Sequence, residues 1–212
     1  MRAASIDTAA SVSIDFTQPS SWASFSFVNV KQRVDGILLN GIYEHGGKPS
    51  GYRALIPDPS INYKDYTVAI TVKPFDTQGD HQTIICGGPS YRWFSLQSDA
   101  KGNLSVTLNN QDVMLAVTNA SIRPNKWTTI VASVSETKGH IIISIDGKKA
   151  ELLRIPVDYK SSIIGSDAES HDRLWTFTNY SNGRVFHGII HQLIAYNAAL
   201  NERECESLVI PR

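Results

Sequence analysis

Short apolar segments that alternate with polar residues and end at turn residues dominate this chain. The clearest is segment 66–73, where large apolar residues from Tyr66 to Val72 alternate with small or polar ones and Pro74 ends the run. A period of two residues is typical of a β-strand buried on one face. No segment before residue 201 has the long 3.6-residue apolar period of a helix. We therefore expect an all-β chain with little helix.

Turn residues separate the further strands that this pattern predicts. These strands are expected at residues 11–16, 93–97, 104–108, 127–134 and 140–146. Gly102 can adopt a positive φ in the loop between two of them, and Asp146-Gly147 is the residue pair of a type I′ hairpin turn. Residues 18–21 are expected to form a turn, and residues 46–51 an exposed loop. This succession predicts a two-sheet antiparallel sandwich.

Length and charge set limits on the domain count and on the partner. A chain of 212 residues is long enough for one sandwich, and we expect a single domain over residues 11–212 after a tail at 1–10. Its 20 basic and 20 acidic side chains leave no net charge, which argues against nucleic acid and favours a neutral partner. No apolar run is long enough to insert into a membrane. We expect Cys86 and Cys205 to be separate buried thiols.

The end of the chain carries a resemblance to a known family. An apolar strand from Phe186 runs into Tyr196-Asn-Ala-Ala-Leu200, and a short charged helical segment follows. This order resembles the last strand of the laminin G-like (concanavalin A-like) jelly-roll family, Phe-x-Gly-x-Ile-Asp, then an apolar run, Tyr-Asn and a short helix. His191 stands where that family has the acid. The resemblance extends over residues 35–208, with further landmarks at 40–43, 51–58, 66–74, 125–132 and 143–148.

The resemblance implies a fold, a class of ligand and a location. The implied fold is a jelly-roll sandwich of two antiparallel sheets with a short C-terminal helix. Lectin-like sugar binding is the implied function, and a protein-interaction or adhesion role is the alternative because the fold does not determine the ligand. An extracellular or cell-surface location fits this family. The first residues lack the apolar centre of a signal peptide, so we expect either a removed leader or a cytoplasmic protein.

Alternation divides the paired strands 92–97 and 103–109 into two faces. The core face is expected to hold Phe94, Leu96, Leu104, Val106 and Leu108. The opposite face would hold Trp93, Ser95, Gln97, Asn103, Ser105, Thr107 and Asn109. Sugars suit such a face, because a pyranose stacks one apolar side on a flat ring and presents hydroxyls to donors and acceptors. An ordinary solvated face is the competing interpretation.

The long segment 165–183 is a second candidate, because extended loops often carry function. We expect Trp175 and Tyr180, together with Tyr91, to form walls of a sugar site around Trp93. Three carboxylates of this segment are candidate ligands for Ca²⁺: Asp167, Glu169 and Asp172. Their spacing does not match an EF-hand, so we rank a solvated acidic loop above a metal site and expect no cofactor.

Catalysis lacks support in the sequence. Glycosidases of this fold place carboxylates at alternate positions of one strand, whereas Glu202, Glu204 and Glu206 lie on the expected helix and do not face one another. Alternation places His187 and His191 with apolar residues, as expected of structural histidines. We therefore predict a non-catalytic carbohydrate-binding module that binds an oligo- or polysaccharide. Trp93 would be the stacking platform, with hydroxyl contacts from Gln97, Asn109 and Ser105. A polysaccharide-cleaving enzyme is the third hypothesis.

Overall fold

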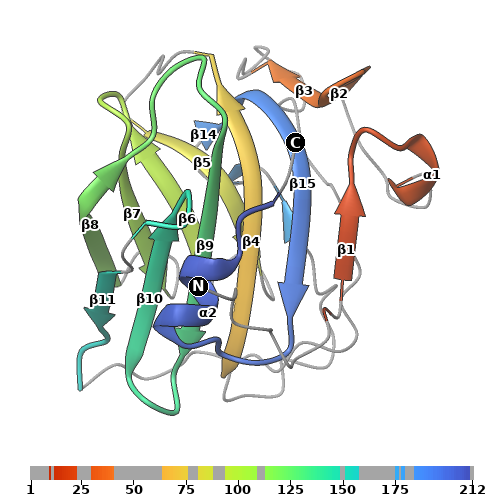
Figure 1. Ribbon diagram of the computed structural model, residues 1–212. Helices are drawn as coiled ribbons and strands as arrows, with labels where there is room; N and C mark the ends of the chain where they lie inside the picture. Colours follow the sequence, from red (N-terminus) through yellow and green to blue (C-terminus); the bar gives the residue numbers. More distant parts are fainter. Residues whose placement is uncertain are drawn as a thin grey trace, which may run out of the picture.

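Two β-sheets pack face to face in the computed structural model (Figure 1). The structure describes residues 10, 12–22, 30–40, 64–75, 81–87, 94–108, 113–148, 151–157, 175–176, 178–179 and 184–210. Its elements are β1 (Val12–Asp15), α1 (Pro19–Trp22), β2 (Val30–Arg33), β3 (Gly36–Asn40), β4 (Asp65–Pro74), β5 (His81–Gly87), β6 (Phe94–Asp99), β7 (Asn103–Leu108), β8 (Val113–Ser121), β9 (Thr128–Ser135), β10 (His140–Ile145), β11 (Glu151–Arg154), β12 (Trp175–Thr176), β13 (Thr178–Asn179), β14 (Arg184–Val185), β15 (His187–Tyr196) and α2 (Glu202–Ser207). None of the helices in this part of the chain is long and apolar enough to cross a membrane.

The chain passes between the two sheets as it does in a jelly roll. Sheet A has the strand order β11-β10-β9-β4-β15-β3-β2, and β1 also pairs with β15. Sheet B has the order β13-β14-β5-β6-β7-β8, and β12 also pairs with β5. All pairings are antiparallel except the short one between β14 and β5. The predicted two-sheet sandwich with little helix is therefore confirmed.

Alternate apolar side chains of both sheets form the core between them. On β4 the buried residues Tyr66, Val68, Ile70 and Val72 belong to this core, as their alternation predicted. The ring of Tyr66 contacts the ring of Phe94 on β6 edge to face, with centroids 6.0 Å apart, and so joins sheet A to sheet B. The core therefore depends on strands that are far apart in the sequence.

A second apolar cluster lies on the outer face of sheet A, where α2 packs across the strands (Figure 1). Asn201 begins α2 with a capping box, in which its side chain accepts the Glu204 N–H and the Glu204 carboxylate accepts the Asn201 N–H. Two hydroxyls attach the preceding segment to the sheet: Ser133 donates to the Leu200 carbonyl, and Thr67 accepts the Leu200 N–H. The expected C-terminal helix is confirmed.

Both cysteines are free and buried, as the sequence predicted. Cys86 lies on β5, whereas Cys205 lies on the apolar side of α2. Burial raises the pKa of each thiol to about 12, because it disfavours the charged thiolate. Neither cysteine therefore has the exposed, low-pKa thiol of a reactive site.

The turns agree with their sequence signals, with one exception. Gly102 has φ +79°, and Asp146 and Gly147 have φ +52° and +67°, which is the pattern of a type I′ turn. Segment 18–21, expected to be a turn, lies instead largely within the short helix α1 (Pro19–Trp22). The Ser21 N–H donates to the Gln18 carbonyl, an i to i+3 bond that turns and short helices share. The expected loop at 46–51 lies outside the described residues.

A β-bulge in β15 changes which residues share a face. The register with β4 shifts between Ile190 and Gln192, so His191 is the extra residue. Simple alternation had placed His187 and His191 with Ile189, Leu193 and Ala195. The bulge instead leaves Leu193 and Ala195 in the core, while Ile189 pairs with Lys73 and lies outside that cluster.

The two histidines of β15 pack as structural residues do. The His191 ring lies edge-on to Trp127 with centroids 5.6 Å apart, and its Nδ1 is 3.1 Å from the Asp35 carbonyl oxygen. The His187 ring makes a similar contact with Phe75, also at 5.6 Å. Each imidazole therefore has an aromatic neighbour in the described part of the chain.

Candidate functional site

A row of hydroxyl and amide side chains crosses sheet B on the side away from the core. Thr83 of β5 pairs with Gln97 of β6, and Gln97 pairs with Ser105 of β7. Ser95 pairs with Thr107 in the neighbouring row. Residues directly opposite in a sheet point to the same face, so these five side chains form one surface, which we name the polar face.

The polar face agrees with the sequence in its orientation but not in its exposure. Phe94, Leu96, Leu104, Val106 and Leu108 are all in the core, so the division of the two strands into faces is confirmed. The opposite face was expected to be open to solvent. Instead Thr83 and Gln97 are 0% exposed, Ser95 4% and Thr107 2%, and only Ser105 is half-buried. Alternation determines the direction of a side chain and not what covers it.

Hydrogen bonding within the polar face is incomplete. The Gln97 amide donates to the Ser95 hydroxyl at 3.0 Å. Burial raises the pKa of the neighbouring Cys86 thiol, and a hydrogen bond with Ser95 only partly offsets this. The Thr83 hydroxyl has no hydrogen-bond partner in the structure, although the side chain is fully buried. Buried hydroxyls are almost always hydrogen-bonded, so Thr83 is an exception that needs a physical reason.

A bulge in β5 determines where Thr83 points. Thr83 pairs with Gln97, but the next pair along the strands joins Ile85 to Leu96, so Ile84 is the extra residue. Ile84 and Ile85 are both buried in the core, and Thr83 is thereby directed to the polar face beside Gln97. Bulges often redirect a side chain near a functional site. Two adjacent core isoleucines interrupt alternation at 84–85, and this was the sequence signal for the bulge.

The structure describes only some of the other predicted site residues. The backbone of Trp175 is in β12, where it pairs with Gly87 of β5, so it lies beside the strand that carries Thr83. The remaining predicted sugar-site residues, Tyr91, Trp93, Asn109 and Tyr180, lie outside the described residues, and so do the predicted calcium ligands Asp167, Glu169 and Asp172. Within the described ranges, no three His, Cys, Asp or Glu side chains are grouped to hold a metal ion.

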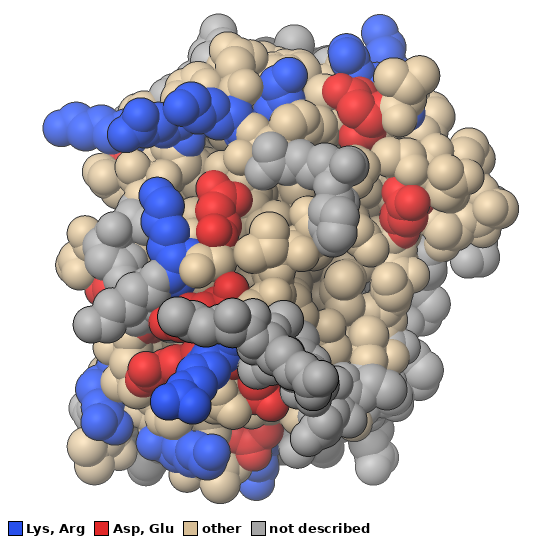
Figure 2. Space-filling model, in the orientation of Figure 1, with Lys and Arg blue, Asp and Glu red and all other residues tan. Residues whose placement is uncertain are grey.

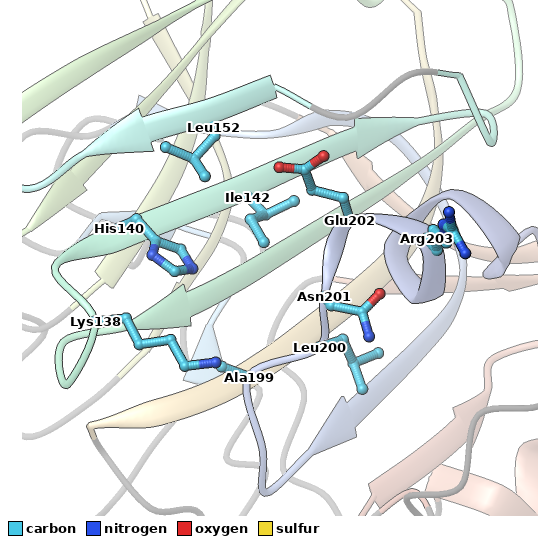
Figure 3. A pocket seen from close by; sticks show the side chains of 9 residues that line it. All are labelled: Lys138, His140, Ile142, Leu152, Ala199, Leu200, Asn201, Glu202 and Arg203. Atoms are coloured by element: carbon cyan, nitrogen blue, oxygen red, sulfur yellow. The ribbon is translucent and has the colours of Figure 1, made fainter.

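A groove of about 440 Å³ lies on the other side of the molecule, between α2 and the strands β10 and β11. Figure 3 shows Lys138 and His140 on one side of it and Asn201 and Glu202 on the other. Its apolar lining comes from Ile142, Leu152, Ala199 and Leu200, and Arg203 completes the rim. Its walls join distant parts of the chain, so local sequence patterns did not indicate it.

The groove does not have the side chains of a glycosidase site. Glu202 is the one carboxylate among the described residues that line it, whereas glycosidases generally use a pair of carboxylates. The described part of its lining also contains no Trp, Tyr or Phe on which a sugar ring could stack. The polar face of sheet B therefore remains the better candidate for sugar binding.

Comparison with solved structures shows the same fold. Domain 4 of AbnA, a GH43 extracellular arabinanase from Geobacillus stearothermophilus in complex with arabinotriose, is 17% identical, with a TM-score of 0.65 over 95% of this chain and 98% of that one. The CBM40 of the Ruminococcus gnavus IT-sialidase, bound to α2,3 sialyllactose, is 16% identical, with a TM-score of 0.52 over 68% of this chain and 82% of that one.

Larger proteins also contain this fold. A sialidase from Trypanosoma rangeli is 14% identical, with a TM-score of 0.58 over 86% of this chain. The match spans only 28% of the sialidase chain. No curated protein sequence is detectably similar to this chain. The family model of the concanavalin A-like lectin/glucanases superfamily matches residues 47–205. Because that match covers most of its length and the two-sheet fold agrees with it, the chain belongs to the concanavalin A-like lectin/glucanase superfamily.

Proposed function

We propose that this protein is a non-catalytic carbohydrate-binding module whose ligand binds at the polar face of sheet B. The observation that carries the proposal is the row of uncharged polar side chains from Thr83 through Gln97 to Ser105, which reaches the surface at the half-buried Ser105. The Ser105 hydroxyl can both donate a hydrogen bond to a sugar hydroxyl and accept one from it.

Two similar structures support a sugar as the ligand. One was solved with arabinotriose and the other with sialyllactose, and both share the two-sheet fold. At 16–17% identity they support the fold and not the details of a site. The choice between ligands therefore rests on the side chains of this chain. The polar face consists of uncharged hydroxyl and amide groups, which suits a neutral oligosaccharide.

The aromatic contact in this proposal comes from Trp93. It lies outside the described residues but precedes Phe94, a core residue of β6, so alternation predicts that its side chain is on the side of the polar face. Tyr91, Trp175 and Tyr180 would form walls around the sugar, and Asn109 would add a further hydroxyl contact. Pairing of the Trp175 backbone with β5 supports the assignment of this residue to the same sheet.

The non-catalytic part of the proposal follows from the chemistry of these side chains. Hydroxyl and amide groups at the polar face bind a sugar but do not supply an acid and a nucleophile. Incubation with β-glucans, galactans, alginate and pectin should therefore release no reducing ends and no unsaturated uronates. Release that rises with protein concentration would contradict this part of the proposal.

A glycan array followed by calorimetric titration tests the binding site. Arabinotriose is the first probe, and Trp93→Ala should weaken binding by about 2 kcal/mol, or about thirtyfold, with little change in the thermal midpoint. Leu152→Ala is the matched control, because Leu152 lines the groove on sheet A. Normal binding by the Trp93 variant together with weak binding by the Leu152 variant would move the site to the groove.

A further inference from the structure

Five basic side chains gather at one edge of the outer face of sheet A. We call this group the basic edge, and its members are Lys31, Arg33, Lys73, Arg123 and Lys126. Four of them are exposed, and Lys73 is half-buried. Figure 2 shows basic side chains along the upper edge of the molecule.

Strand register places two of these lysines in one row. Lys73 of β4 pairs with Ile189 of β15, Ile189 pairs with Leu38 of β3, and Leu38 pairs with Lys31 of β2. Neighbouring strands are about 4.8 Å apart, so three spacings separate the backbones of Lys73 and Lys31 by about 14 Å. Arg33 is two residues beyond Lys31 on the same strand and therefore shares its face.

A tight turn adds the other two cations beside Lys73. The Lys126 N–H donates to the Arg123 carbonyl, which closes the turn. The Asn125 N–H donates to the carbonyl of Pro74 at 2.6 Å and fixes this turn to the end of β4. Trp127 then follows, and the Lys73 ammonium lies 5.9 Å from the centre of its ring. The basic edge therefore continues from β2 across the sheet to the turn before β9.

Little of this charge is neutralised by the described neighbours. Asp35 contacts Arg33, with 3.0 Å between the Nε and Oδ1 atoms. That carboxylate balances one of the five cations. The whole chain has no net charge, so the basic edge is a local excess on a neutral protein. Such an excess attracts anions at short range, because salt screens charges beyond about 8 Å under physiological conditions.

We propose that the basic edge binds an acidic polysaccharide, a linear chain bearing carboxylates or sulfates. A row of cations on a sheet surface suits a linear anion with repeated charges. Trp127 does not offer an open ring for stacking, because the Lys73 ammonium lies over it and His191 contacts it edge-on. Stacked bases are central to the binding of single-stranded nucleic acid, so this surface favours recognition by charge alone.

Polygalacturonate, dextran sulfate and uncharged dextran are suitable probes, and dextran separates charge from sugar contacts. Calorimetry at 50 mM salt should show binding to both acidic polymers and none to dextran. The double variant Arg123→Gln/Lys126→Gln should weaken binding at least about tenfold. It should also reduce the slope of log K against the logarithm of the salt concentration by about two, because two ion contacts are lost. Lys101→Gln/Lys138→Gln removes the same charge from exposed positions outside the basic edge and should bind normally.

Equal weakening by the two double variants would overturn the proposal, since binding would then follow total charge. Tighter binding of duplex DNA or phosphatidylserine vesicles through Arg123 and Lys126 would assign the basic edge to a different partner. The result is independent of the proposed sugar site on sheet B. Trp93→Ala should leave polygalacturonate binding unchanged, and the Arg123/Lys126 variant should leave arabinotriose binding unchanged.

Discussion

The carboxylate of Glu151 accepts the backbone N–H of Thr118 with both of its oxygens, at 2.8 and 3.0 Å, and accepts the Thr118 hydroxyl at 2.7 Å. Glu151 lies on β11, an edge strand of sheet A, whereas Thr118 lies on β8, an edge strand of sheet B. The β7–β8 register shifts between Asn103 and Ser105, so β8 loses regular pairing near Thr118. Glu151 thus supplies an acceptor where the ladder is interrupted and joins the two sheet edges.

Replacement of Glu151 by Ala should destabilise the protein by about 1 kcal/mol, because hydrogen bonds at an exposed site contribute modestly. Urea unfolding of the single variants and of the pair Glu151→Ala/Thr118→Ala measures the coupling. Thr118→Ala alone should cost less, since its backbone N–H remains bonded. Additive losses from the two changes would show that the Thr118 hydroxyl contributes nothing to the contact.

Thr83→Val should raise stability and leave sugar binding unchanged. Valine has nearly the shape of threonine and removes the hydroxyl that has no partner, so the cost of burying that group disappears. The expected gain is about 1 kcal/mol in the free energy of unfolding, measured in urea without ligand. Arabinotriose titration should show unchanged binding by the same variant, because Thr83 is 0% exposed and does not reach the surface. A less stable variant would show that the hydroxyl has a structural partner instead.

Asp65 should make the stability depend on pH in the acid range. Partial burial would raise the pKa of this carboxyl, but hydrogen bonds from Ser135 and Thr137, both at 2.6 Å, and the charge of Lys138 outweigh burial and hold the pKa below its usual value. A lowered folded-state pKa stabilises the fold above the unfolded value of about 3.9, and this stabilisation is lost as the pH falls through the folded pKa.

Asp65→Asn should therefore be destabilising at pH 7 and approach the wild-type stability as the pH falls below about 4. Urea midpoints of both proteins between pH 2 and 7 measure this difference. A difference that stays constant over the whole range would mean that the ionised carboxylate does not contribute through its charge.

Gly36 should tolerate no side chain, whereas Gly139 should tolerate one. Gly36 has φ +141°, and an added Cβ would clash with the carbonyl oxygen of Ile190 beside the bulge of β15. We expect Gly36→Ala to cost about 2–4 kcal/mol. Gly139 has φ +66° with no atom within 4 Å of an added Cβ, so Gly139→Ala should cost only about 1 kcal/mol. Similar thermal midpoints for both variants would exclude the clash as the dominant cost.

Local chemistry allowed much of the fold to be predicted. Alternation identified the core residues of β4, β6 and β7, because the direction of a side chain in a strand depends on its own backbone. Gly102 and Asp146-Gly147 indicated turns, because positive φ angles favour those residue types. The apolar strand from Phe186 and the charged segment after Leu200 indicated the last strand and the short C-terminal helix, whereas the cap at Asn201 was found only in the structure.

Contacts between distant segments decided what local patterns could not. The sequence by itself determined that Gln97 points away from the core, but its complete burial depends on the packing of other parts of the chain. The bulges at Ile84 and His191 arise from the register of neighbouring strands, and each redirects side chains that simple alternation would place elsewhere. A total charge of zero also says nothing about position. Only the pairing of β2, β3, β15 and β4 brings Lys31 and Lys73 into one row.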